Sequence, residues 1–215
     1  MQQFTWVTGM VLKQTPIGEY DRRICLLTKE NGKISAFARG ARRPGNALQA
    51  STIPFTFGKF KLFAGRDSYS IAEADIENYF SELKTDYIGA YYGMYFCEIA
   101  DYYTRENNDD REMLKLLYQS FRALCSSAIP NELVQAVFEL KAIAVNGEYP
   151  GPPTDRVLED STIYAMNYIA TSPVEKLYTF TVKDSVLRQL RQVAEEYRRH
   201  FMDRDFKSLE ILKTL

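Results

Sequence analysis

The segment Arg39-Gly40-Ala41-Arg42-Arg43-Pro44-Gly45, called the arginine loop below, places three guanidinium groups on a stretch of otherwise small residues. A guanidinium can donate two parallel hydrogen bonds to one phosphate, and glycine lets the backbone approach a ligand closely. Nothing nearby resembles a recognition helix that would read base edges. The loop therefore predicts sequence-independent binding of nucleic-acid phosphates, and the alternative is a solvated basic loop without a ligand.

The charge of the surrounding chain favours the first interpretation. Residues 1–66 carry 11 basic and three acidic side chains, a net charge of +8, whereas the remaining residues carry a net charge of −9. The overall charge of −1 thus hides two oppositely charged parts. A basic part that binds a polyanion, joined to an acidic part with another role, is the simplest physical interpretation.

In two segments of the basic part, apolar or small residues alternate with residues that include lysine and arginine. Successive residues of a strand point to opposite faces, so each segment predicts one buried and one exposed row. Cations beside aromatic rings on a sheet can follow a phosphate backbone while bases stack on the rings. The predicted outward row of 33–39 is Lys33, Ser35, Phe37 and Arg39, and that of 57–63 is Phe57, Lys59, Lys61 and Phe63.

The elements that must hold these side chains are short strands. Between Phe4 and Ile76, segments rich in β-forming residues are separated by turn signals. Four or five strands in this length favour a small closed barrel, because an open sheet would leave its edges unpaired. Asn31-Gly32 predicts a type I′ hairpin turn between strands 20–28 and 33–39.

After Asn78 the apolar residues recur at helical spacing. We therefore expect an α+β protein: an OB-fold barrel in residues 1–80, followed by an all-helical domain in residues 81–215. The predicted helices are 83–104, 110–127, 131–146, 161–170, 183–201 and 205–213.

The sequence offers little for catalysis or a cofactor. It contains no nucleotide-binding phosphate loop, no histidine-based triad, no metal motif and no defensible pair of catalytic carboxylates. We expect no enzyme activity, no cofactor and no small-molecule substrate. No stretch reaches the roughly 18 apolar residues of a membrane helix, and the start does not resemble a signal peptide. The predicted location is the cytoplasm, in association with the nucleoid.

Several segments resemble the bacterial recombination mediator family RecO. The similarity is specific over residues 9–76 and weaker, though collinear, afterwards. Its strongest parts are Gly9-Met10-Val11-Leu12-Lys13, Gly18-Glu19-Tyr20-Asp21-Arg22, Leu27-Thr28-Lys29-Glu30-Asn31-Gly32 and Ala38-Arg39-Gly40-Ala41-Arg42-Arg43-Pro44.

The resemblance implies a non-enzymatic role in DNA repair by the RecF pathway. It implies binding of single- and double-stranded DNA, annealing of complementary strands, and loading of RecA with RecR on DNA coated by single-stranded DNA-binding protein. It makes Arg22, Lys33, Arg39, Arg42 and Arg43 the leading candidates for DNA contacts. Strand parity and charge add Phe37, Lys59, Lys61 and Arg66.

One departure from the family concerns a metal. Many members carry four cysteines in the helical domain as a zinc site. Here residues 147–173 contain neither cysteine nor histidine, so tetrahedral zinc has no adequate ligand set. We expect no metal.

The resemblance also implies contact with the acidic, apolar-ended tail of single-stranded DNA-binding protein. A receptor for such a tail should combine an apolar groove with a few cations. In the acidic helical part the candidates are Lys115, Arg122, Arg188 and Arg191, of which the last two share a helical face.

Two other functions fit the same surface chemistry. A generic RNA-binding OB module would look alike, because charge and stacking do not read the 2′-hydroxyl. A protein-binding adaptor could use the arginine loop to bind an acidic partner.

Overall fold

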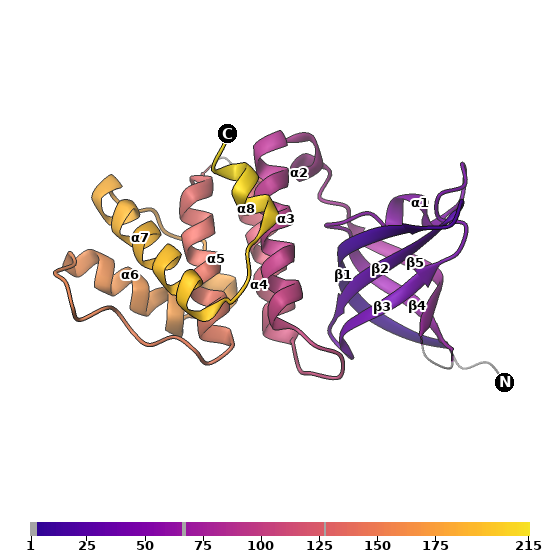
Figure 1. The fold of residues 1–215 in the computed structure, drawn as a ribbon, viewed down its shortest axis with the longest axis horizontal. Coiled ribbons are helices and arrows are strands. Elements are labelled where there is room, and N and C mark those ends of the chain that lie inside the picture. Colours follow the sequence, from indigo (N-terminus) through magenta and orange to yellow (C-terminus); the bar gives the residue numbers. More distant parts are fainter. Residues whose placement is uncertain (1–3, 66–67, 127) are drawn as a thin grey trace.

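A computed structural model describes residues 4–65, 68–126 and 128–215 and contains a β-barrel followed by helices (Figure 1). The closed strand order is β1-β2-β3-β5-β4, so the expected α+β architecture with a small N-terminal barrel is confirmed. The strands are β1 (Phe4–Ile17), β2 (Asp21–Thr28), β3 (Gly32–Ala38), β4 (Phe57–Ala64) and β5 (Tyr69–Asn78), with the short helix α1 (Leu48–Ser51) between β3 and β4.

The long strand β1 serves both halves of the barrel. Its first half pairs with β4 and its second half with β2, and Gly9 pairs with both Gly58 and Thr28 at the crossing. A side chain at Gly9 would lie 2.4 Å from the carbonyl oxygen of Leu27, so only glycine fits this crowded bend.

Alternation places the apolar row of each strand inside the barrel. Ile34, Ala36 and Ala38 of β3 are buried. The alternate residues Lys33, Ser35 and Phe37 point the other way and are partly exposed. Phe60 and Leu62 of β4 are buried in the same core. The predicted parity of both segments is confirmed.

The predicted pairing of strands 20–28 and 33–39 is also confirmed, but their turn differs from the type I′ prediction. Thr28 pairs with Gly32, so Lys29, Glu30 and Asn31 form a three-residue turn. The Thr28 hydroxyl donates to the Gly32 carbonyl and accepts from the Asn31 amide, and these side-chain bonds stabilise the longer turn.

The helical part agrees with its predicted periodicity. β5 ends at Asn78 and α2 begins at Ser81, and the division into domains at residue 80 stays a prediction. The helices are α2 (Ser81–Thr85), α3 (Tyr87–Tyr103), α4 (Arg111–Leu124), α5 (Asn131–Val145), α6 (Asp160–Thr171), α7 (Asp184–Phe201) and α8 (Lys207–Leu212), with a 3₁₀ turn at Val174–Lys176.

The helix predicted for 83–104 is in fact two helices. Asp86 has extended backbone angles and accepts a hydrogen bond from the Ile88 amide at 3.1 Å, which makes it the N-cap of α3.

The barrel interior has an apolar core of its own, and the outer wall of the barrel contributes to a second core with the helices. α3 and α4 lie beside the barrel, and α6 and α7 lie at the far end of the molecule (Figure 1). Met10, Leu12 and Leu27 point out of the barrel and are buried in the same cluster as the helices. None of the described helices is both long and apolar enough to cross a lipid bilayer.

Candidate nucleic-acid interface

The arginine loop is held at the end of the barrel by its backbone. Ala41 is completely buried in the barrel core. The Arg42 amide donates to the Tyr20 carbonyl at 2.8 Å, and the Gly40 amide donates to the Asp21 carboxylate at 2.7 Å. Gly40 has φ +67°, a left-handed conformation that suits glycine. The loop is therefore preorganised, with a buried residue between exposed arginines.

The three guanidiniums of the loop are exposed and face solvent. Arg42 donates to the Gly18 carbonyl at 3.1 Å, and the Arg43 guanidinium lies 4.6 Å from the centre of the Tyr20 ring. Among the described residues none of the three forms an ion pair with a carboxylate. These guanidiniums can therefore accept an external anion without first breaking a salt bridge.

Arg22 has an internal role instead. Arg22 stands opposite the buried Ala38 in the β2–β3 register, so it lies on the inward-facing side of β2. Its guanidinium donates to the Gln49 carbonyl at 2.6 Å and to the Thr52 hydroxyl at 2.9 Å. Burial, together with the nearby charge of Arg42, lowers the pKa of Arg22. The side chain connects β2 to α1 and to the residue after it, and a DNA contact by Arg22 stays a prediction.

Lys33 contacts the helical part. Its ammonium donates to the Asp101 carboxylate at 2.8 Å and to the Asp101 carbonyl at 2.5 Å. Burial acts to raise the pKa of Asp101, but the hydrogen bond and charge of Lys33, together with Arg204 and Cys25, outweigh it and lower that pKa. This ion pair joins the barrel to α3, and a DNA contact by Lys33 stays a prediction. Strand alternation correctly predicted that Lys33 points outward, but it could not predict that α3 lies against this side chain.

The lysines of β4 lie on the outward face as expected, but acids accompany them. Lys61 forms an ion pair with Glu73 at 3.3 Å, and Lys59 stands opposite Asp75 in the β4–β5 register. This face is consequently less cationic than the strand β4 alone indicates. Arg66, the remaining basic candidate of this region, lies outside the described residues.

The structure adds aromatic and basic residues that the sequence interpretation missed. Phe4 and Trp6 are exposed on β1, next to Phe63 and Lys61 of β4. Arg23 is exposed opposite Phe37 in the β2–β3 register. Alternation around the buried Val7 was the signal that could have placed Phe4 and Trp6 on the outside.

The four cations predicted for partner binding fall into two groups. Arg188 and Arg191 of α7 line a cavity of about 360 Å³ together with Arg198 and Lys213. Apolar side chains of Leu209 and Leu212 also line it.

Lys115 and Arg122 lie elsewhere, on α4. Lys115 pairs with Glu112 at 2.8 Å, and Arg122 lines a separate cavity. The structure therefore brings only Arg188 and Arg191 together.

The cavity at Arg188 and Arg191 has a mixed charge. Glu195 takes three of the neighbouring cations as partners, Lys213 at 3.5 Å among them. Within the described part of the chain, neither Arg188 nor Arg191 has a carboxylate partner. The buried Glu139 also lines the cavity and accepts hydrogen bonds from Tyr95 and Gln135. The two unpaired arginines beside leucines can accept a peptide that is both acidic and apolar.

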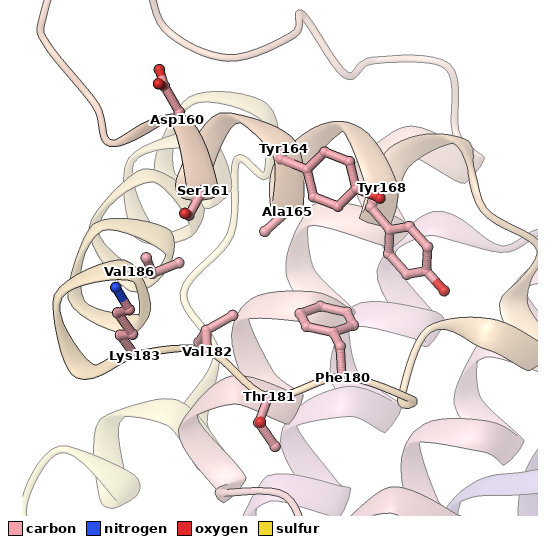
Figure 2. A pocket seen from close by; sticks show the side chains of 10 residues that line it. All are labelled: Asp160, Ser161, Tyr164, Ala165, Tyr168, Phe180, Thr181, Val182, Lys183 and Val186. Carbon is pink, nitrogen blue, oxygen red and sulfur yellow. The ribbon is translucent and has the colours of Figure 1, made fainter.

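Another cavity, of about 630 Å³, lies between α6 and the segment before α7 (Figure 2). Figure 2 shows the rings of Tyr164 and Tyr168 on α6 and that of Phe180 on the facing segment. Its two charged residues, Asp160 and Lys183, have opposite signs. It holds none of the predicted site residues and gives no preference for an anion. No group of three potential metal ligands occurs among the residues described.

Two family models match the chain. The family model "Recombination protein O N terminal" matches residues 1–80, and "Recombination protein O C terminal" matches residues 84–151. The DNA repair protein RecO of Acetivibrio thermocellus is 28% identical over 240 residues, covering 97% of this chain and 96% of the relative. RecO of Clostridium acetobutylicum is 26% identical, covering 96% of both chains. RecO of Clostridium novyi is 35% identical over 139 residues, 65% of this chain and 54% of the relative.

Proposed function

The chain belongs to the RecO family of DNA repair and recombination proteins, and from this premise we propose that it acts as a recombination mediator that binds DNA through the arginine loop. The observation that supports the proposal most directly is the loop itself: three exposed guanidiniums without carboxylate partners among the described residues, on a backbone anchored by the buried Ala41. Such a loop can bind the phosphates of single-stranded or duplex DNA whatever the base sequence.

The proposed activity needs no catalytic step. A protein that neutralises the phosphates of two complementary strands lowers their repulsion and raises the rate at which they meet. Annealing by this route consumes no ATP. We propose that the same binding, together with RecR, helps to load RecA on DNA coated by single-stranded DNA-binding protein.

Salt dependence tests the phosphate contacts. Binding of three phosphates by the arginine loop releases counterions, so the log of the affinity for single strands should fall with the log of salt concentration with a slope of about −2 or steeper. Fluorescence anisotropy of a labelled oligonucleotide between low and physiological salt measures this slope. A slope near zero would contradict the proposal. RNA of the same sequence in the same titration separates DNA preference from general nucleic-acid binding.

We propose that the cavity at Arg188 and Arg191 receives the acidic, apolar-ended tail of single-stranded DNA-binding protein. The two arginines would bind the acidic residues, and Leu209 with Leu212 would contact the apolar end. This combination of charge and apolar surface matches the chemistry of the tail.

Charge reversal tests this partner site. Arg188→Glu with Arg191→Glu should weaken binding of a fluorescent peptide with an acidic stretch and an apolar C-terminal pair by about tenfold or more, because like charges would then face each other. The matched control is Lys115→Glu with Arg122→Glu, which changes the charge equally on α4. Equal losses in both double variants, or no loss in the first, would count against the site.

A further inference from the structure

Three aromatic side chains gather on the outside of the barrel where β1 pairs with β4. Phe4 and Trp6 keep 46% and 44% of their surface exposed, and Phe63 is partly exposed beside them. We call Phe4, Trp6 and Phe63 the aromatic patch. Single exposed aromatics are common on protein surfaces, but a cluster of them marks an interaction site more often.

The strand register holds the patch together. Phe4 stands opposite Phe63, with ring centres 5.9 Å apart, and Trp6 stands opposite Lys61. The Lys61 ammonium lies 5.3 Å from the centre of the Phe4 ring and 5.8 Å from that of Trp6. Two of the rings, those of Phe4 and Trp6, therefore lie close to a cation, and the β-ladder sets the backbone positions of all three aromatic residues.

The patch lies on the part of the barrel that the helices leave open. The outward side chains Met10, Leu12 and Leu27 of the second half of β1 and of β2 are buried against the helices. In contrast, the outward side chains of the first half of β1 remain accessible to solvent. No described segment covers Phe4 and Trp6.

The charges around the patch favour bases over phosphates as its ligand. Glu73 pairs with Lys61, and Asp75 stands opposite Lys59, so the acids of β5 offset much of the cationic charge here. Closely spaced duplex phosphates would meet these acids. Ring faces instead attract unstacked bases, which only a single strand presents.

The register also connects the patch with the arginine loop. Phe63 stands opposite Ser70, Ser70 stands beside Phe37, and Phe37 is the outward residue two positions before Arg39. Arg23, across from Phe37, adds an exposed cation to this row. One extended strand can contact rings at one end of the row and guanidiniums at the other.

We infer that the aromatic patch is a single-strand subsite, in which bases stack on Trp6 and its neighbouring rings while the arginine loop binds phosphates. This inference rests on the proposed function and adds to it a physical basis for distinguishing single strands from duplex. Duplex DNA would contact the arginine loop but leave the patch empty.

Trp6 is the only tryptophan in the chain, so its fluorescence reports the patch directly. The full-length protein is titrated with an oligothymidine, with an oligonucleotide of the same length made of abasic sites, and with a duplex. Stacking predicts quenching by the oligothymidine alone. The abasic strand keeps every phosphate, so it separates stacking from charge.

Substitution gives a second measurement. Trp6→Ala should weaken binding of the oligothymidine about tenfold, since stacking of a base on an aromatic ring contributes substantially to affinity. It should leave the affinity for the abasic strand unchanged. Trp6→Phe, which keeps a ring, should restore most of the loss. Tyr164→Ala is the matched control, because Tyr164 is 73% exposed on α6, far along the chain from the barrel.

The possible results are distinguishable. Equal affinity for thymidine and abasic strands without change in Trp6 fluorescence would overturn the subsite and leave phosphate binding by the arginine loop intact. Equal quenching by both strands would show that the patch senses phosphates, which also overturns it. Failure of the wild-type protein to bind any strand would overturn the proposed function and the subsite together.

Discussion

Replacement of Arg39, Arg42 and Arg43 together by glutamate is expected to lower affinity for single-stranded DNA about 100-fold or more, because like-charge contacts cost several kcal/mol and each 1.4 kcal/mol is tenfold. The salt slope should also become flatter by about 2, since three phosphate contacts are lost on a single strand. The fold should persist, because all three side chains are exposed and the buried Ala41 that anchors the loop is unchanged.

Anisotropy with a labelled oligonucleotide measures both quantities, and circular dichroism checks the fold. Arg122→Glu, Lys176→Glu and Lys183→Glu together form the matched control, because they change the net charge equally on exposed positions of the helical part. Wild-type affinity in the arginine-loop variant would refute the assignment. The same loss in the control would mean that net charge alone governs binding.

Phe121→Ala is expected to destabilise the protein by about 3–5 kcal/mol, the usual cost of removing a large aromatic side chain from a core. Phe121 of α4 is fully buried, and its ring lies 5.1 Å from that of Phe55 and 5.3 Å from that of Phe80. Phe55 precedes β4 and Phe80 follows β5, so the substitution removes packing from the place where strands and helices meet.

Urea unfolding gives the free energy of unfolding for this comparison. Trp6 fluorescence follows the barrel and far-ultraviolet circular dichroism follows the helices, and both transitions should move together if the shared core couples the two parts. Tyr164→Ala serves as the control, since exposed substitutions usually change stability by less than about 0.5 kcal/mol. A loss below about 1 kcal/mol for Phe121→Ala, or separate transitions, would contradict this view of the core.

Local patterns were enough to predict most of the fold. Strand alternation in 33–39 and 57–63 reproduces the buried and exposed rows, because a half-buried sheet sorts side chains with a period of two. Helical periodicity gave most of the helix ends to within a few residues. The three-residue turn before Gly32 escaped prediction because a hydroxyl of Thr28, not the turn residues themselves, decides its length.

The candidate site was predictable only where no distant segment intervenes. The arginine loop follows from residue type and local turns. Arg22 and Lys33 are equally basic, but their partners Thr52 and Asp101 lie 30 and 68 positions away. A sequence shows that a basic side chain exists, whereas tertiary contacts decide whether that side chain already has an internal hydrogen-bond or ion-pair partner. The partners of Trp6 were hidden for the same reason, because Lys61 and Phe63 join it only through the β1–β4 register.

Met10, Leu12 and Leu27 are buried although they point away from the barrel interior, because the helices cover them. A fragment that stops at Asn78 would turn them into a wetted apolar face and should self-associate. We therefore expect the barrel to need α3 and α4, or a replacement that covers the same apolar side chains, to remain monomeric.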